Sequence, residues 1–198
     1  DGRHAYFVSL ETDLIAQYAL GDDLSLSPLD PATADAPAGS GPRHLAFSDD
    51  ERTVYVLTEF TGEVLRFRRD PASGILDFID ATPAHDPSEK LRHSVIDEDP
   101  RENHYVWGAD IHLTDGVVWA SERTASTLAA LRIDADGSLS APTGFAATEE
   151  QPRGFAVSDD RALLVAAGER STTVSLYRVD GADLHLQGRY ETGRGANW

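Results

Sequence analysis

The 198-residue sequence contains no cysteine and no methionine, and Lys90 is its single lysine. Without cysteine, disulfides, thiolate metal sites and cysteine nucleophiles are excluded. No stretch approaches the roughly 20 consecutive apolar residues that a membrane-spanning helix needs, so we expect no membrane partner. The sequence begins at Asp1 and shows no signal peptide, which favours a cytoplasmic location. Because a translation product begins with methionine, we expect that upstream residues, including any signal peptide, have been removed.

Positive charge is also scarce. Seventeen Lys and Arg residues stand against 34 Asp and Glu residues, which gives a formal net charge of −17 at pH 7. Such a field repels phosphate backbones, and the sequence therefore predicts no nucleic-acid partner. An anionic substrate must then be held by a local group of arginines, and its binding should depend on salt.

Three common kinds of site have no matching motif in the sequence. There is no GxSxG nucleophile elbow and no glycine loop with nucleotide-binding spacing. Several histidines and acidic residues lie close together in the sequence, but their spacings match neither HExxH nor an EF-hand loop. These residues are His85, His93, His104, His112, Asp86, Asp97, Glu98 and Asp99. We therefore predict neither a metal nor another cofactor.

A short phrase does recur, at intervals of 67, 43 and 44 residues. It reads GPRHLAF at residues 41–47, GADIHL at 108–113, QPRGFAV at 151–157 and GANW at 195–198. Periods of about 40–50 residues that are built from short strands are typical of propeller blades.

Each unit of the repeat contains four short apolar runs with turn residues between them and no helical period. The first complete unit has runs at residues 43–48, 53–58, 63–68 and 75–81. The next has runs at 111–113, 117–120, 127–133 and from 139 onward, and the third at 154–157, 163–166, 173–179 and 184–190. Asp and Gly at the bends tolerate the backbone conformations of hairpins. The pattern predicts an all-β fold, a β-propeller of four-stranded antiparallel blades.

We interpret residues 1–198 as one partial propeller domain. The blades are expected at about 1–40, 41–107, 108–150 and 151–194, with the start of a closing strand at 195–198. Residues 1–8 align with 50–57, so the first blade lacks its first strand, and we expect a truncated larger ring rather than a closed four-bladed one. Residues 82–107 break the period and are expected to form one long inter-blade loop. Open blade edges would also favour self-association.

The antiparallel order of strands also predicts a cluster of charged side chains. The start of a blade's first strand and the end of its second strand lie at the same face, which places Arg43 beside Glu59. Arg123 aligns with Glu59 in the next blade, and Leu10 and Gly168 hold that position in the other two. The expected cluster, at the mouth of a central channel, contains Arg43, Glu59, Asp110, Arg123 and Arg153.

Simpler structural interpretations stay open for each of these residues. Arg43 and Arg153 could brace neighbouring blades through backbone carbonyls, and Glu59 could merely pair with an arginine. Arg123 could be a solvated turn residue. His44 and His112 could be hydrogen-bonded between blades rather than catalytic. Three arginines that converge with a glutamate nevertheless favour binding of a carboxylate or phosphate, because guanidinium groups grip both bidentately.

Several of these motifs together resemble the seven-bladed lactonase family, which contains bacterial 6-phosphogluconolactonases and fungal carboxymuconate-cyclising enzymes. The motifs are GPRHLAF at 41–47, YVLTE at 55–59, ADIHL at 109–113, ASER at 120–123, QPRGFAV at 151–157 and GRGANW at 193–198. The resemblance covers essentially the whole chain and implies that it corresponds to about four C-terminal blades of seven.

The resemblance also implies a site and an activity. It assigns catalytic roles to Arg43, Arg123 and Glu59, and we expect Arg153, His44, Asp110 and His112 to bind the substrate. The family's histidine would fall before residue 1, so the isolated chain is expected to be inactive.

The implied reaction is hydrolysis of a small anionic lactone, of the 6-phosphogluconolactone type. Glu59 or the absent histidine would activate water, and the arginines would hold the anion and stabilise the oxyanion. The alternatives are a muconate-lactone cycloisomerase and a non-catalytic propeller that binds a protein or a small ligand.

Overall fold

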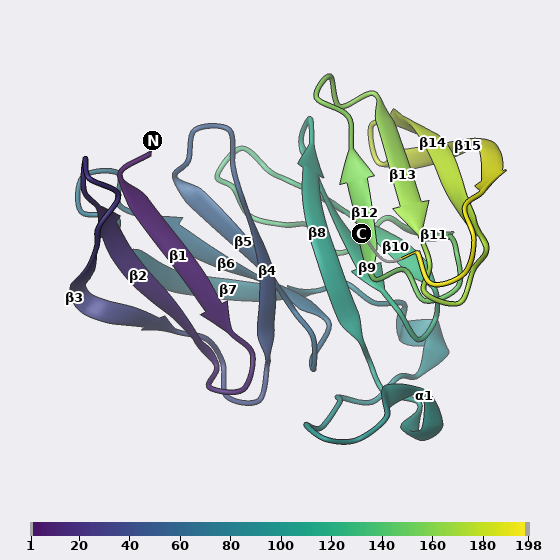
Figure 1. The fold of residues 1–198 in the computed structure, drawn as a ribbon, viewed down its shortest axis with the longest axis horizontal. Coiled ribbons are helices and arrows are strands. Elements are labelled where there is room, and N and C mark those ends of the chain that lie inside the picture. The colour runs from purple at the N-terminus through teal and green to yellow at the C-terminus, as the bar shows by residue number, and fades with distance from the viewer. Residues whose placement is uncertain (1, 197–198) are drawn as a thin grey trace.

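The protein is built from four antiparallel β-sheets, which we call blades 1 to 4 in chain order (Figure 1). The structure, a computed structural model, describes residues 2–196. Blade 1 has three strands, β1 (His4–Ser9), β2 (Leu14–Leu20) and β3 (Leu26–Asp35). Blade 2 has β4 (Pro42–Phe47), β5 (Thr53–Thr58), β6 (Glu63–Arg69) and β7 (Leu76–Pro83). Blade 3 has β8 (Gly108–Thr114), β9 (Val117–Glu122), β10 (Thr127–Arg132) and β11 (Gly144–Ala147). Blade 4 has β12 (Gly154–Val157), β13 (Leu163–Ala167), β14 (Thr173–Asp180) and β15 (Asp183–Glu191).

In every blade, the strands pair in chain order. The three-stranded blade comes first, as expected from the alignment of residues 1–8 with 50–57. These sheets confirm the predicted all-β fold and the partial propeller of about four blades.

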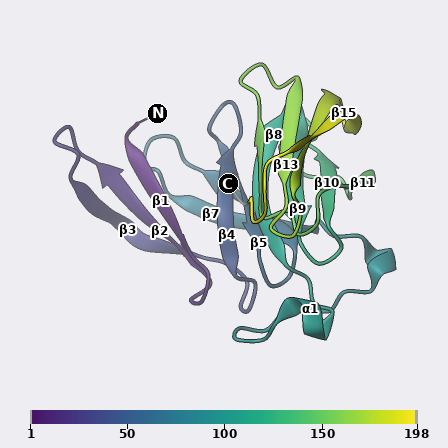
Figure 2. The same ribbon diagram turned by 45° about the vertical axis from the view of Figure 1, so that its right-hand side comes forward.

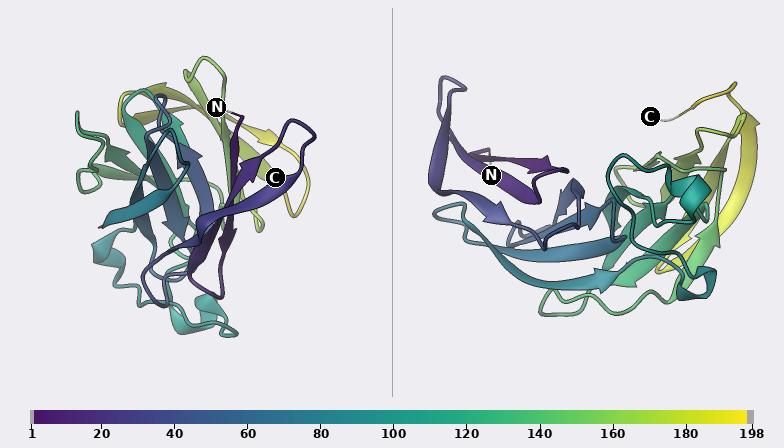
Figure 3. Two further views of the ribbon diagram at one scale, coloured as in Figure 1. Left: turned by 90° about the vertical axis from the view of Figure 1, so that its left-hand side faces the viewer. Right: turned by 90° about the horizontal axis from the view of Figure 1, so that it is seen from below.

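The blades stand side by side in an arc, with blade 1 at one end and β15 at the other (Figure 3). The first strands of the complete blades lie on the inner side of this arc. β8 contacts β4 on one side and β12 on the other, and β1 contacts β4. These strands line a cavity of about 1030 Å³ that is open to solvent. Residues that lie far apart in the sequence therefore face one shared space.

The hydrophobic core consists of three clusters, each of which lies between two neighbouring blades. Between blades 2 and 3, Tyr55 and Leu57 pack against Ile111 and Leu131. Between blades 3 and 4, Trp119 packs against Phe155 and other side chains. The third cluster joins blades 1 and 2. The middle blades are covered on both faces, which explains why β5 and β9 are almost entirely buried.

The turns between first and second strands repeat one hydrogen-bonding device. In blade 2, Ser48 Oγ donates to Asp50 (2.7 Å) and accepts from the backbone of Thr53 (3.0 Å). Ser158 does the same in blade 4, with Asp160 (2.6 Å) and Leu163 (3.0 Å). The serine and the aspartate thereby fix both tight turns.

The turn in blade 4 also carries Arg161, which reaches the corresponding turns of the two other complete blades. Its Nη1 donates to Asp49 of blade 2 (2.9 Å) and to Asp115 of blade 3 (3.0 Å). Its Nη2 also pairs with Asp49. One guanidinium group therefore joins three blades at one end of the cavity.

Two features differ from the sequence-based expectations. Residues 82–107 are not a plain loop: β7 continues to Pro83, and the helical turns η1 (Pro87–Glu89) and α1 (Pro100–Asn103) follow (Figure 2). Asp86 and Asp99 cap these turns through backbone amides, which explains the short helices in a polar segment.

The last strand of blade 3 begins at Gly144 rather than near residue 139. Pro142 has no amide hydrogen and cannot join a ladder, so Leu139 forms only an isolated bridge with Ile133. The expected closing strand at 195–198 extends to Asn197 and Trp198, which lie outside the described residues. Across residues 2–196, no helix is long and apolar enough to cross a membrane.

Candidate functional site

The predicted contact between Arg43 and Glu59 is present. Arg43 Nε donates to Glu59 Oε2 at 2.8 Å, although 16 residues separate the two. Arg43 Nη1 donates to the carbonyl of Ala109 (2.5 Å) and to Nε2 of His44 (3.2 Å). Arg43 therefore does brace the next blade, as one interpretation proposed, and it also holds the glutamate. Within residues 2–196, its Nη2 has no hydrogen-bond partner, and Arg43 lines the cavity.

Trp107, at the end of the long inter-blade segment, connects Glu59 to Arg123. The indole Nε1 donates to Glu59 Oε1 at 3.1 Å. The guanidinium group of Arg123 lies over the same indole ring, 3.2 Å from its centroid. Both oxygens of Glu59 are thus engaged, one by Arg43 and one by Trp107. The Arg123 side chain is only 6% exposed, so its interpretation as a solvated turn residue was wrong.

Glu169 joins Arg123 to Arg153. Arg123 Nη2 pairs with Glu169 Oε2, and Arg153 Nη1 donates to Glu169 Oε1 at 3.2 Å. The backbone N of Glu169 bonds to Gln151 O, just as that of Glu59 bonds to Gly41 O. Glu169, and not Gly168, is therefore the equivalent of Glu59 in blade 4. The expected assignment of Gly168 was wrong by one residue because the apolar pattern does not define where the ladder ends.

A second group of polar residues lies on the inner strands. Asp110 Oδ1 accepts from His44 Nδ1 (2.8 Å), and Oδ2 lies 3.3 Å from His112 Nε2. Backbone amides of Ile111 (2.9 Å) and Phe155 (3.2 Å) also donate to this carboxylate. Asp110 is thus shared by blades 2, 3 and 4. The inter-blade interpretation of His44 agrees with these contacts.

Burial and pairing shift the ionisation of these groups. Burial alone would raise the pKa of Asp110, but hydrogen bonds from His112 and His44 outweigh it and hold the pKa well below its ordinary value. Burial also opposes ionisation of Glu169, yet pairing with Arg123 keeps its pKa low. Burial lowers the pKa of Arg123. Asp110 and Glu169 are therefore charged at neutral pH.

Glu122, next to Arg123, is a buried residue whose carboxylate binds backbone amides. Its carboxylate accepts from the backbone amides of Trp107 (2.8 Å), Thr124 (3.1 Å) and Ala125 (2.6 Å). Burial raises the pKa of Glu122, against the effect of these bonds. It closes the turn after β9 and holds Trp107 beside Glu59 and Arg123.

The structure brings all seven predicted site residues into one continuous network. Four of them line the cavity: Arg43, His44, Asp110 and His112. The other three, Glu59, Arg123 and Arg153, extend the network away from it through Trp107 and Glu169. No group of three or more His, Asp or Glu side chains that could hold a metal ion occurs between residues 2 and 196. The network offers fixed cationic donors, anionic acceptors and an exposed imidazole beside a large open cavity.

Trp107 and Glu169 were missed from the sequence. The 16-residue spacing of Arg43 and Glu59 recurs between Arg153 and Glu169, and this spacing alone could have identified Glu169. Trp107 gave no such signal, because it follows a segment that matches no other part of the repeat.

Four antiparallel blades around a shared cavity define a partial β-propeller, and the cavity combines a mostly apolar lining with a few charged side chains, as ligand pockets commonly do. The sequence matches the family model "Lactonase, 7-bladed beta-propeller" over residues 1–193, and the chain belongs to that family.

Solved structures show the same fold. A candidate 6-phosphogluconolactonase from Bacteroides fragilis is 24% identical, with a TM-score of 0.82, over 98% of this chain and 53% of its own. A protein from Lactobacillus plantarum is 23% identical, with a TM-score of 0.84, over 98% and 54%. The periplasmic gluconolactonase of Pseudomonas aeruginosa is 23% identical, with a TM-score of 0.80, over 99% and 53%. The chain thus spans about half the length of these structures.

Proposed function

We propose that the protein is a lactone hydrolase that acts on a small anionic sugar lactone of the 6-phosphogluconolactone type. One observation carries the proposal: Arg43 lines the cavity, and within residues 2–196 its Nη2 has no hydrogen-bond partner, while Glu59, His44 and the Ala109 carbonyl fix the rest of its guanidinium group. A donor that is held in place before substrate arrives can stabilise the oxyanion of ester hydrolysis without reorganisation. Family membership supports this chemistry, and so do the names of two solved relatives.

Each charged residue then has a role that follows from its contacts. Arg43 binds the carbonyl oxygen or the anionic group of the substrate. Glu59 holds Arg43 in place, since both of its oxygens already accept hydrogen bonds. Arg123 and Arg153, which share Glu169, provide positive charge that attracts an anion against the negative field of the whole protein.

The test is hydrolysis of 6-phosphogluconolactone and gluconolactone by the full-length protein, followed as acid release in a pH-stat. Arg43→Ala should lower kcat/KM by about 100-fold or more, as expected for loss of an oxyanion donor. Arg68→Ala is a matched control, because Arg68 also pairs with an acid, Asp77, but is exposed on the third strand of blade 2 and does not line the cavity. Equal rates for wild type and Arg43→Ala would refute the proposed site. No turnover of any lactone would favour a binding protein.

A further inference from the structure

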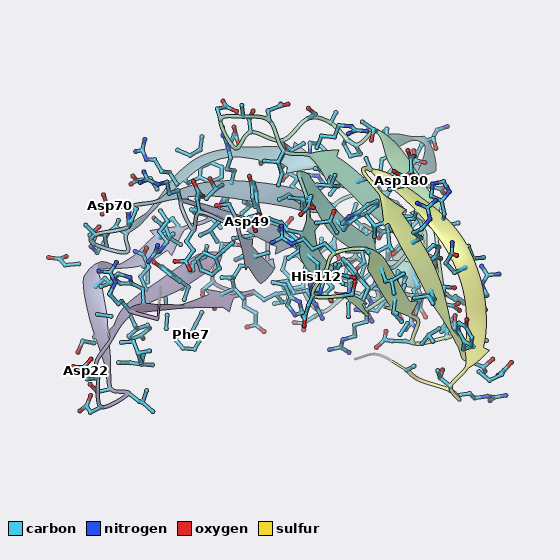
Figure 4. All side chains as sticks on the ribbon, turned by 90° about the horizontal axis from the view of Figure 1, so that it is seen from above. Phe7, Asp22, Asp49, Asp70, His112 and Asp180 are labelled. Atoms are coloured by element: carbon cyan, nitrogen blue, oxygen red, sulfur yellow. The ribbon has the colours of Figure 1, made fainter. Side chains whose placement is uncertain are left out.

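His112 is one of the residues that line the cavity. Its side chain is 39% exposed, and Figure 4 shows it on the inner side of the arc. The ring packs edge-on against Phe155, with centroids 4.7 Å apart, and Asp110 lies beside Nε2. The imidazole is therefore oriented by two contacts while part of it faces the cavity.

The hydrogen bonds around Asp110 determine which ring nitrogen of His112 carries the proton. An ionised carboxylate only accepts hydrogen bonds, so Nε2 of His112 must donate to Asp110. In the neutral ring, Nδ1 then has the lone pair. Within the described part of the chain, Nδ1 of His112 has no hydrogen-bond partner.

The other candidates for a base are less available. His44 uses Nδ1 to donate to Asp110 and Nε2 to accept from Arg43, which leaves no free lone pair on its ring. Glu59 accepts one hydrogen bond at each oxygen, from Arg43 and from Trp107, and it is not among the residues that line the cavity. A base needs a free acceptor within reach of the proton that it removes. Of these three residues, only His112 has an unused ring nitrogen within the described chain and also lines the cavity.

We propose that His112 is the general base of the lactone hydrolysis and that Asp110 is its positioning residue. This inference rests on the proposed function. In this proposal the proton acceptor is His112, rather than Glu59 or a histidine that precedes residue 1. Arg43, which lines the same cavity, supplies the donor for the carbonyl oxygen.

In the proposed reaction, His112 moves one proton from water to the leaving group. Nδ1 of His112 takes a proton from water while the water oxygen bonds to the lactone carbonyl carbon. The carbonyl π electrons move to the oxygen, which faces Arg43. When they return, the ring C–O bond breaks, and the proton on Nδ1 passes to the leaving alkoxide. The products are the open-chain hydroxy acid and neutral His112.

The test compares variants of the full-length protein in the same hydrolysis assay. His112→Gln should lower kcat by about 100-fold or more, the usual contribution of a general base, with little change in KM. His112→Ala should regain activity when imidazole is added, which a purely structural role would not allow. His185→Gln is the matched control, since His185 also lies near an aspartate, 3.7 Å from Asp180, but on an outer strand.

A spectroscopic measurement tests the role of Asp110. In ¹⁵N spectra of the histidine rings, neutral His112 should carry its proton on Nε2, and Asp110→Asn should shift the population toward the Nδ1–H form. An Nδ1–H ring in the wild-type protein would overturn the inference. So would normal kcat in His112→Gln alongside an active wild type, which would leave the proposed function intact. Failure of the wild type to hydrolyse any lactone would refute both.

Discussion

Gly108 is the position where one added methyl group should disturb both stability and the site. A Cβ at this residue would lie 2.2 Å from the carbonyl oxygen of Thr58 in the neighbouring blade. That oxygen belongs to the backbone, so no side chain can move aside to relieve the overlap. Gly108 does not have a left-handed φ, and the penalty of Gly108→Ala therefore comes from the close approach of two blades.

The overlap requires the two backbones to separate by roughly 1 Å, because an ordinary carbon–oxygen contact is longer than 3 Å. Forced overpacking of this kind costs about 3 kcal/mol of unfolding free energy. The same movement displaces the bond from Gly108 N to Glu59 O (3.0 Å) and the carbonyl of Ala109 that holds Arg43 (2.5 Å). A displacement of this size near reacting groups costs about 100-fold in rate.

Denaturant unfolding of Gly108→Ala and Gly144→Ala measures the effect. Gly144 lies in the same blade, has no atom within 4 Å of an added Cβ and has no left-handed φ, so its substitution should change stability by less than about 0.5 kcal/mol. If both variants unfold at the same denaturant concentration, the close approach of blades 2 and 3 at Gly108 does not limit stability, and the reasoning is refuted.

Two further predictions concern charge. Asp110 has a folded-state pKa below its ordinary 3.8, because hydrogen bonds from His112 and His44 outweigh burial. The ionised carboxylate therefore contributes to the unfolding free energy above pH 3.8, and this contribution is lost as the pH falls from 3.8 toward the lower folded-state pKa. Asp110→Asn should show a shallower loss of unfolding free energy between pH 4 and pH 2 in urea titrations, and an unchanged slope would contradict this. Arg161→Ala should cost about 1 kcal/mol at low salt, since Asp49 and Asp115 are exposed. The difference from wild type should vanish in high salt, whereas a salt-independent loss would show that the ion pairs are not its cause.

The parts of the site that the sequence predicted are those that strand geometry determines. Arg43 and Glu59 meet because a hairpin of fixed length returns the chain to the same face. The position of Glu169 depends on which backbone amide closes the ladder at Gln151, and apolar periodicity does not reveal that register. Trp107 follows two short helical turns whose path no repeat defines, so its placement over Arg123 could be known only from the structure.

The fold was predictable because strand geometry also determines it, and the structure differs from the predicted strands only locally. The repeated strands and turns fixed four sheets in order, while Pro142 delayed the last strand of blade 3. The roles of His44 and His112 were left open between structural and catalytic interpretations. Within residues 2–196, both ring nitrogens of His44 are engaged and one of His112 is not, and our proposal of a catalytic role for His112 rests on this difference.

The bonds of Arg161 to two other blades have a consequence for how the protein comes apart. In a linear array of repeats, each unit contacts only its neighbours, and unfolding can stop at any boundary between them. Arg161 couples blade 4 directly to blade 2 as well as to blade 3. Opening the boundary between blades 2 and 3 therefore also strains a bond that belongs to blade 4. This second-neighbour coupling favours loss of the three blades as one cooperative unit rather than one at a time.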